Sequence, residues 1–368
     1  MGVLLLNTVA WKKELKDFLL NNPKDCKVVV LPDFFLDRLI NLNWNFTEFS
    51  HLIRDVAKRK GGSIDSIPQT DLRGGNAINV ASALANLGAK VTPIVCTSQS
   101  GLQQLKCYFK EVPIDTSHIK IREKASITTA LEFKNRNEKS NVMLRDVGSL
   151  KSFGPNDLDD SDYALIGSAD YTCVFNWAGT LNFGTALAQT VFDRAKTKGK
   201  GKTYYDTADP TPNIGKVAEL METVLKSNKV DILSLNENEA IVYASLIDSS
   251  LNDKKMGLEF AEFAMEAARI LARNLTARID LHTTAFSASL RSKTEVMVPS
   301  FKVKVLRATG AGDAWDAGNI LGDRNGLSDE CRLMFANAVS ACYLSDPEGK
   351  HPNWTKLSTF IKKRCLSN

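Results

Sequence analysis

The sequence predicts an α/β protein: a three-layer sandwich in which a mostly parallel central sheet lies between two layers of helices. From residue 163 onward, short apolar runs alternate with helical patterns, which is typical of parallel strands covered on both faces. The predicted strands are 163–166, 203–205, 232–235 and 279–281, and they end at Gly167-Ser168, Asp206, Asn236 and His282. Helices are predicted between them, including 183–195 and 260–271. Ligands of such sheets bind beyond the carboxyl ends of the strands, so these polar ends predict one shared site.

The composition narrows the class of protein. A chain of 368 residues with 43% hydrophobic content can bury the core of one large domain with an appendage. A net charge of +5 without a dense basic tract argues against a nucleic-acid partner. No apolar run approaches the ~18–20 residues of a membrane span. Seven scattered cysteines and only four histidines favour neither a disulfide framework nor a zinc site, so we expect a reducing cytoplasm.

The N-terminus is predicted to be an amphipathic helix. Trp11, Leu15, Phe18 and Leu19 share one helical face. We treat residues 1–25 as a helical extension that precedes a main domain of residues 26–368. Two placements of this helix are open, against its own domain or against a partner subunit, and a homodimer is one of the assemblies left open.

A buried strand at 27–31 ends beside two carboxylates, Asp33 and Asp37. Either can accept two hydrogen bonds from a diol, whereas Asp33 is equally suited to cap a helix. A helix is expected near 49–57, and short alternating runs at 127–133 and 142–145 predict half-exposed antiparallel strands. Arg145, at the end of the second run, can reach a substrate oxygen or can simply lie on the surface.

Two glycine-rich segments each precede a predicted helix. Gly74 and Gly75 allow backbone to approach a ligand closely, and the helix that follows contains Asn79 and ends near Gly88. The turn Gly310-Ala311-Gly312-Asp313 opens a second helix, whose free N–H groups and dipole suit an anion. An aspartate beside bound phosphate is understandable if it takes the proton of an attacking hydroxyl. The alternative is a glycine turn with an aspartate cap.

Together these two segments resemble the N-terminal and C-terminal signatures of the ribokinase-like (PfkB) carbohydrate kinases. The resemblance implies a ribokinase-like sandwich with a small β lid, whose segments we expect within 38–73 and 97–150. It implies ATP- and Mg²⁺-dependent transfer of the γ-phosphoryl group to a hydroxyl of a sugar, with ATP as co-substrate. Relatives act on sugars, sugar phosphates, polyols and nucleosides, so a nucleoside kinase remains an alternative, as does a kinase-like binding protein without turnover.

The resemblance also implies roles for individual residues. Asp313 is the expected catalytic base, and Gly310, Ala311 and Gly312 form the expected anion hole. The expected substrate-binding residues are Asp33, Asp37, Gly74, Gly75, Asn79 and Arg145. The expected nucleotide-binding residues are Asn236, Glu239, Thr283, Thr284 and Asn337. Asn236 and Glu239 resemble the family's Asn-x-x-Glu motif, and Glu239 is the expected magnesium residue, while acidic residues are also typical of a helix start.

The sequence departs from the family pattern at three places. Pro32 stands where a glycine is expected, and the run after the first strand also lacks the Gly-x-Gly-x-x-Gly of a dinucleotide-dependent oxidoreductase. His282 stands in the nucleotide segment, and we expect it to be a structural histidine. Arg307 replaces an aspartate that helps to hold a monovalent cation in relatives, and since a guanidinium cannot bind K⁺, we expect K⁺-independent activity.

Overall fold

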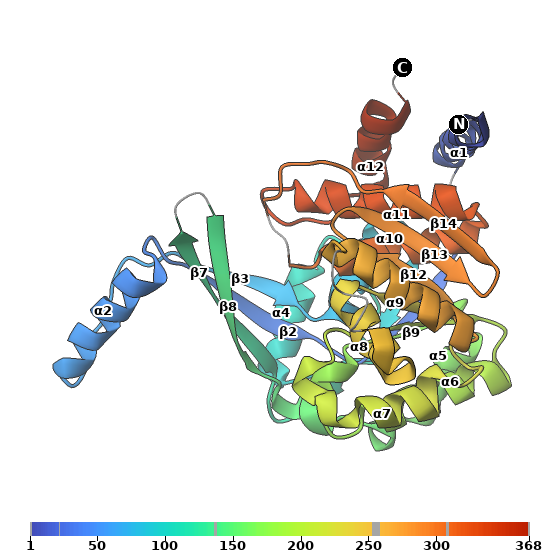
Figure 1. Ribbon diagram of the computed structural model, residues 1–368. Helices are drawn as coiled ribbons and strands as arrows, with labels where there is room; N and C mark the ends of the chain where they lie inside the picture. Colours follow the sequence, from blue (N-terminus) through green and yellow to red (C-terminus); the bar gives the residue numbers. More distant parts are fainter. Residues whose placement is uncertain (1, 22, 136–137, 252–257, 307–308, 367–368) are drawn as a thin grey trace.

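A central sheet organises the molecule (Figure 1). The computed structural model describes residues 2–21, 23–135, 138–251, 258–306 and 309–366. In these residues the sheet has eight strands in the order β14-β13-β12-β11-β10-β9-β1-β4. Its strands are β1 (Lys27–Leu31), β4 (Lys90–Pro93), β9 (Tyr171–Phe175), β10 (Lys202–Asp206), β11 (Ile232–Leu235), β12 (Arg278–His282), β13 (Phe286–Arg291) and β14 (Thr294–Pro299). The strands from β4 to β12 are parallel, and β13 and β14 continue the sheet as antiparallel strands.

Helices cover both faces of this sheet, which confirms the predicted α/β class. Alternate residues of β1 enter two separate cores, Val29 and Leu31 on one face and Val28 and Val30 on the other. The first core is completed by α5 (Asp160–Ser168), α6 (Gly184–Lys198), α7 (Val217–Leu220), α8 (Glu237–Ile247) and α9 (Phe260–Asn274). The second is completed by α1 (Gly2–Leu20), α3 (Asn76–Asn86), α4 (Gln99–Tyr108), α10 (Ala311–Asn325), α11 (Asp329–Leu344) and α12 (Trp354–Ile361).

The predicted strands at 203–205, 232–235 and 279–281 are confirmed, but the strand predicted at 163–166 is wrong. These residues lie in α5, whose first turn carries a capping box: the side chain of Asp159 accepts from the backbone of Asp162, and the Asp162 carboxylate accepts from the backbone of Asp159 at 2.8 Å. That reciprocal pair stabilises the start of a helix, and the acidic residues at 159–162 indicate such a start in the sequence. The strand comes afterwards, at Tyr171–Phe175.

The N-terminal helix α1 packs on its own chain. The ring of Phe18 makes edge-to-face contacts with Phe335 of α11 and Trp354 of α12, with centroids 5.2 and 5.3 Å away. The Glu14 carboxylate also accepts from the backbone N–H of Ser328, the residue that caps α11, at 2.7 Å. Of the two placements left open by the sequence, the helix therefore takes the one against its own domain. Among the described residues, no helix combines the length and apolar character needed to cross a membrane.

A second sheet projects from one side of the body (Figure 1). Its strands are β3 (Gln69–Gly74), β2 (Phe35–Asn41), β7 (Ser126–Asn135) and β8 (Glu138–Asp146), in that order. The antiparallel strands predicted at 127–133 and 142–145 are confirmed, and the structure shows that they pair with each other as β7 and β8. Helix α2 (Phe46–Lys58) is inserted between β2 and β3 and lies at the far end of this sheet. A short pair, β5 (Cys96–Thr97) and β6 (Lys120–Ile121), completes the described strands.

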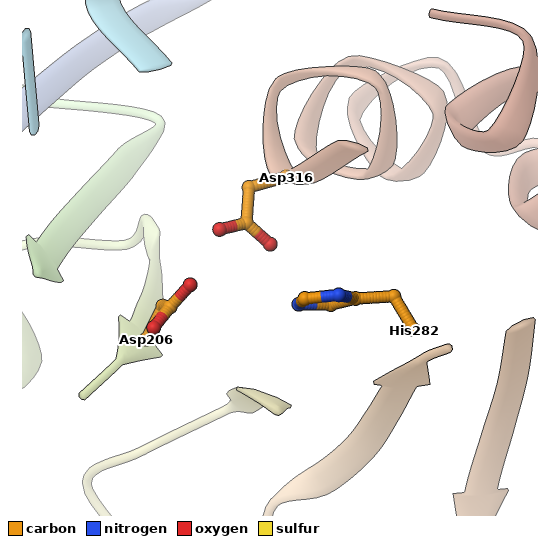
Figure 2. Close-up of side chains that lie close together, drawn as sticks. All are labelled: Asp206, His282 and Asp316. Carbon is orange, nitrogen blue, oxygen red and sulfur yellow. The ribbon is translucent and has the colours of Figure 1, made fainter. Parts of the chain in front are cut away.

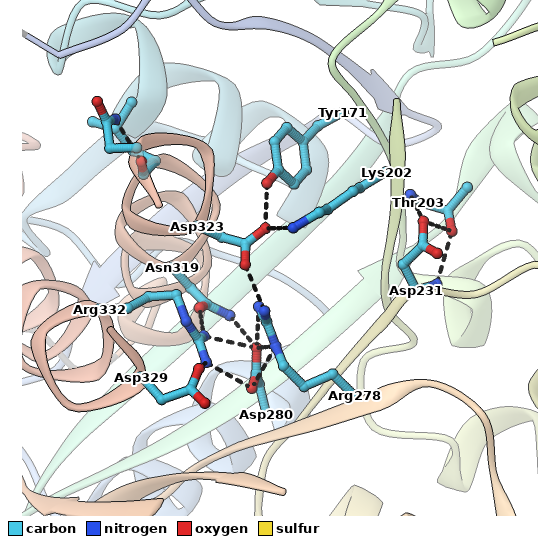
Figure 3. Close-up of polar contacts among 12 residues, drawn as sticks. Tyr171, Lys202, Thr203, Asp231, Arg278, Asp280, Asn319, Asp323, Asp329 and Arg332 are labelled. Atoms are coloured by element: carbon cyan, nitrogen blue, oxygen red, sulfur yellow. Dashed lines mark hydrogen bonds and ion pairs between the residues drawn. The ribbon is translucent and has the colours of Figure 1, made fainter. Parts of the chain in front are cut away.

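A buried polar network ties α10 and α11 to the sheet (Figure 3). The Asp280 carboxylate on β12 forms ion pairs with Arg278 at 2.8 Å and with Arg332 of α11 at 3.0 Å. It also accepts a hydrogen bond from Asn319 of α10 at 2.9 Å. The two guanidinium groups hold the pKa of Asp280 well below its usual value although the group is fully buried. The network fixes α10, and with it the N-terminal turn of that helix, relative to the strand ends.

Candidate active site

The site is built on the N-terminal turn of α10. Gly310 is the residue before the helix, with φ +87° and no side chain to cap it. The amides of Ala311, Gly312 and Asp313 therefore lack intrahelical acceptors and are available to an anion. A Cβ at Gly310 would lie 2.8 Å from the hydroxyl of Tyr343, which donates to the carbonyl of Thr309 at 2.9 Å. The turn thus requires glycine for its backbone conformation and for its packing.

Asp313 follows this turn, and its carboxylate points at α3. Oδ1 accepts from the side-chain amide of Asn76 and Oδ2 from that of Asn79, both at 2.8 Å. The side chain is 5% exposed, and burial raises its pKa to about 8, with the charges of Asp206 and Asp33 adding to the rise. A carboxylate fixed by two donors and titrating near neutral pH is suited to general-base chemistry.

Asp33 lies under the start of α3 and is fully buried. Its carboxylate accepts from the backbone N–H groups of Asn76 and Ala77, each at 2.9 Å, and from the side chain of Asn176 at 2.7 Å. Gly75, with φ +90°, lets the chain pass so close that a Cβ would lie 2.9 Å from the carbonyl of Asp33. Asp33 therefore accepts from the first two free N–H groups of α3, and its predicted role in substrate binding stays a prediction.

Asp37, on β2, faces the glycine segment from the second sheet. Its carboxylate lies directly over Gly74, where a Cβ would be 2.1 Å from Oδ2. Burial raises the pKa of Asp37 to about 6, while Thr128 and Arg145 act in the opposite direction. The guanidinium of Arg145 lies 5.0 Å from the centroid of the Phe35 ring. Because the charge of Arg145 lowers the pKa of Asp37, the two side chains interact electrostatically beside the glycine segment.

Asn236 and Glu239 form the capping box of α8. The Asn236 side chain accepts from the backbone N–H of Glu239 at 3.0 Å, and the Glu239 carboxylate accepts from the backbone and side-chain N–H groups of Asn236 at 2.9 and 2.6 Å. Burial and the nearby Asp206 raise the pKa of Glu239 well above its usual value. The motif therefore begins a helix, and the Glu239 carboxylate interacts electrostatically with Asp206 at the end of β10.

The remaining predicted nucleotide residues are held by the protein itself. The hydroxyl of Thr283 closes the turn between β12 and β13 by donating to the carbonyl of Phe286 at 2.8 Å. Thr284 is exposed, and its backbone N–H donates to Glu237 at 3.0 Å. The amide of Asn337 is buried, accepting from Ser287 at 2.6 Å and Trp315 at 2.8 Å and donating to the carbonyl of Pro299 at 3.0 Å. Arg307 lies outside the described residues.

Three further residues meet at the edge of the central sheet where the parallel strands end, which we call the rim. The sequence predicted Asp206 and His282 at this edge but did not join Asp316 to them. Asp206 at the end of β10, His282 at the end of β12 and Asp316 on α10 point toward one another (Figure 2). One potential metal-ligand atom from each lies within 4.8 Å of the other two. Asp316 follows Asp313 by three residues, so a shared helical face was a readable signal. Asn76, beside the glycine pair, was also missed as a contact of Asp313.

Three of the four predicted strand ends, at Asp206, Asn236 and His282, therefore form one region, whereas Gly167 and Ser168 lie in α5, before β9 begins, and are not a strand end. Asn79 contacts Asp313 directly, and the charges of Asp33 and Asp206 both influence the pKa of Asp313. Asp206 in turn raises the pKa of Glu239. The N-termini of α3, α8 and α10 thus surround a rim that has free backbone amides, one fixed carboxylate and an excess of negative charge. This arrangement can hold an anion beside a proton acceptor.

Solved structures share the fold. The chain is similar to ribokinase from Cryptococcus neoformans var. grubii serotype A in complex with ADP, with 16% identity, a TM-score of 0.69, and coverage of 91% of this chain and 98% of that one. It is similar to adenosine kinase from Sinorhizobium meliloti, with 16% identity, a TM-score of 0.69, and coverage of 92% and 99%. Ribokinase from Arabidopsis thaliana, complexed with ribose and ATP, has 14% identity, a TM-score of 0.67, and coverage of 92% and 99%.

The sequence itself gives a family. No curated protein matches the chain, but the family model described as pfkB family carbohydrate kinase matches residues 51–356. This match includes both glycine-rich segments, the Asn236-Glu239 pair and Asp313. The chain belongs to the pfkB family of carbohydrate kinases.

Proposed function

We propose that the protein transfers the γ-phosphoryl group of ATP to a hydroxyl group of a sugar, with Asp313 as the catalytic base. The observation that carries this proposal is the fixed carboxylate of Asp313, held at 2.8 Å by both Asn76 and Asn79 beside the open amides of α10. Family membership and the ADP and ATP in the named relatives support ATP as the co-substrate. We assign residues 1–25 to an extension and 26–368 to the kinase domain, with the second sheet as its lid.

The reaction is an in-line displacement. The acceptor hydroxyl oxygen forms a bond to the γ-phosphorus while the bond from that phosphorus to the oxygen bridging to the β-phosphate breaks, and ADP leaves. Asp313 takes the hydroxyl proton. The N–H groups of Ala311, Gly312 and Asp313 stabilise the negative charge on the transferring group, because they point at it without reorganisation. The lid excludes water, which would otherwise compete as acceptor.

The acidic rim fits a magnesium ion. Glu239 is 2% exposed, and each of its carboxylate oxygens accepts one hydrogen bond from Asn236, which leaves lone pairs for the waters of a hydrated ion. Burial raises the pKa of Glu239, and the charges of Asp206, Asp209 and Glu237 add to the rise, so these carboxylates favour a cation. Glu239 would hold Mg²⁺ through water, and the ion would neutralise the ATP phosphates.

Two alternative functions compete with that of a sugar kinase. A nucleoside acceptor is favoured by the similarity to adenosine kinase, which equals that to ribokinase in TM-score. A binding protein without turnover stays an alternative because the hydroxyl of Thr283 and the amide of Asn337, both expected to bind nucleotide, make contacts within the protein. The retention of a positioned Asp313 is the reason to prefer a catalyst.

An ADP-release assay over sugars, sugar phosphates, polyols and nucleosides tests the proposal. We expect acceptor-dependent ADP release for a sugar, with a phosphorylated product identified by mass spectrometry. Release with a nucleoside alone would favour the nucleoside kinase. Binding of ATP without release for any acceptor would overturn the proposal in favour of a silent binding protein. Asp313→Asn serves as the catalytic control for contaminating kinases.

A further inference from the structure

Two buried atoms beside the rim lack hydrogen-bond partners among the described residues. They are Oδ2 of Asp316 and Nε2 of His282. The other carboxylate oxygen of Asp316 is fully served, since it accepts from the hydroxyls of Tyr204 and Ser234, both at 2.6 Å. Asp316 is 0% exposed, so bulk solvent does not reach its second oxygen. Buried polar atoms are nearly always paired, and these two point into the same space.

The space between them is negatively charged. Asp206 faces Asp316 from the end of β10, so its carboxylate brings a second acceptor rather than a donor. Burial lowers the pKa of His282, and the charges of Asp206, Glu237 and Asp280 act in the opposite direction, although Asp280 is itself paired with Arg278 and Arg332. Asp206 also raises the pKa values of Glu239 and Asp313. The leading influences on the pKa of Asp316 are burial and Asp206, both of which raise it, and no lysine or arginine is among them. Asp206 and Glu237 thus bring negative charge to the cluster, which favours a bound cation.

The donor set specifies the kind of cation. Nε2 of His282 has no hydrogen-bond partner among the described residues, so it can offer a nitrogen lone pair. One imidazole nitrogen with two carboxylate oxygens suits Mn²⁺, Co²⁺ or Zn²⁺, whereas Mg²⁺ prefers oxygen ligands alone. We propose that Asp206, His282 and Asp316 bind one first-row transition-metal dication, through Nε2 of His282, Oδ2 of Asp316 and an oxygen of Asp206.

The ligands are held in place by their neighbours. Tyr204 and Ser234 fix Asp316, and the backbone N–H of Ala208 donates to Oδ1 of Asp206 at 2.8 Å. The His282 ring packs on Trp315 with centroids 5.0 Å apart. Such supporting contacts orient metal ligands and strengthen binding. Gly312 leaves room for the ring, since a Cβ there would lie 3.2 Å from Cε1 of His282.

This site is distinct from the proposed Mg²⁺ position. Glu239, the expected magnesium residue, is not a member of the three-residue cluster. The competing explanation is a proton shared between Asp206 and Asp316. The two explanations differ in stoichiometry, because only the first predicts one bound ion per chain. Neither depends on kinase activity.

The test is metal binding by the full chain after treatment with a chelator. Equilibrium dialysis against Zn²⁺, Mn²⁺ and Mg²⁺ separately, and titration with Co²⁺ followed by visible absorption, give stoichiometry, selectivity and ligand type. We expect one Zn²⁺ or Co²⁺ per chain, Zn²⁺ at least tenfold tighter than Mg²⁺, and Co²⁺ bands of a nitrogen-containing site.

Two variants assign the site. Asp316→Asn keeps an oxygen for Tyr204 and Ser234 but removes the charge, and His282→Gln removes the ring nitrogen. Each should weaken Zn²⁺ binding at least tenfold. The matched control is His118→Gln, which removes a histidine paired at 2.8 Å with Asp162 elsewhere. Absence of a bound ion, equal affinity for Mg²⁺ and Zn²⁺, or unchanged binding in both folded variants would overturn the proposal. Circular dichroism identifies folded variants, and one folded variant of the two is sufficient.

Discussion

The side-chain amide of Asn76 lies 2.8 Å from Oδ1 of Asp313, across the gap between the first turns of α3 and α10. Asn79, three residues later on the same helical face, reaches the other oxygen at the same distance. The two glycine-rich segments therefore build one site together. Helix α10 contributes the Asp313 carboxylate and the free amides, and α3 contributes the two donors that orient the carboxylate. This pairing gives the proposed base a single orientation before any ligand binds.

Replacement of Asp313 by Asn should abolish proton acceptance. General-base catalysis contributes roughly 10²–10⁴ in rate, so turnover should fall by at least that range. ATP affinity, measured by fluorescence or calorimetry, should stay within about threefold because the backbone amides of the turn remain. Asp160→Asn is the control, since Asp160 occupies the first turn of α5 and is exposed. Turnover within tenfold of wild type would remove Asp313 from the mechanism.

The pH profile should report the raised pKa of Asp313. A base acts in its deprotonated form, and the carboxyl has a pKa of about 8 because it is buried. Below that pH the protonated form dominates, so log kcat/KM should rise with a slope near one from pH 6 to about 8 and then level off. A profile that is flat from pH 6 to 9, measured with the most active acceptor, would contradict this assignment.

Asn76→Ala should move that acid limb to higher pH. The amide hydrogen bond favours the charged carboxylate, so its loss raises the pKa of Asp313 further. A hydrogen bond to a charged group contributes roughly 1.5–3 kcal/mol, which corresponds to about one to two pH units. Asn86→Ala removes an amide from the other end of α3, where it donates to the carbonyl of Ser82, and should leave the limb unchanged. An unshifted limb in a folded Asn76→Ala protein would assign Asn76 a purely structural role.

Gly310→Ala should destabilise the turn for two separable reasons. Left-handed backbone costs a residue with a Cβ about 1–2 kcal/mol, and this Cβ would also meet the Tyr343 hydroxyl at 2.8 Å. Thermal or denaturant unfolding measures the sum. Adding Tyr343→Phe removes the nearest atom while φ stays positive, so the double variant should recover part of the lost stability. Because Tyr343→Phe also removes the hydrogen bond to Thr309, the double variant is compared with Tyr343→Phe alone, and an undiminished loss in that comparison would assign the effect to backbone strain.

The buried network of Figure 3 should be a large contributor to stability. Arg332→Met leaves the buried Asp280 with one cation fewer, and breaking such pairs costs about 3–5 kcal/mol. Arg269→Met is the control, because its partners Glu266 and Glu295 are surface residues and exposed pairs contribute about 0–1 kcal/mol. Urea unfolding compares the two. Equal losses would mean that Asp280 is adequately served by Arg278 and Asn319.

Many strands and helices could be predicted from the local spacing of apolar residues and glycines. Strands β10, β11 and β12 and helices α3, α6, α9 and α10 follow directly from apolar spacing and glycine punctuation. The exception at 163–166 arose because Tyr-Ala-Leu-Ile suits either state, and the capping box that decides it lies four residues upstream. Gly88, predicted to end α3, has φ +93° just beyond that helix, as the pattern requires.

The candidate site could be predicted only in part, because the role of several side chains depends on contacts between distant elements. Asp313 and Asn79 belong to local motifs, but whether Asp33 caps a helix or meets a ligand depends on where α3 begins, and the sequence allowed both. The hydroxyl of Thr283 and the amide of Asn337 suit phosphate or adenine by type, yet each closes a contact within the protein. Asp206, His282 and Asp316 are brought together by the order of the strands, which no local pattern encodes.

Gly74 and Asp37 share a volume that holds only one side chain, because a methyl group on Gly74 would overlap the carboxylate. The two positions are consequently bound by epistasis: a larger residue at 74 is tolerable only after the aspartate is shortened or withdrawn. Related sequences that differ at one of these positions should therefore differ at the other as well. If Asp37 selects the acceptor, a change of acceptor should accompany substitutions at both positions.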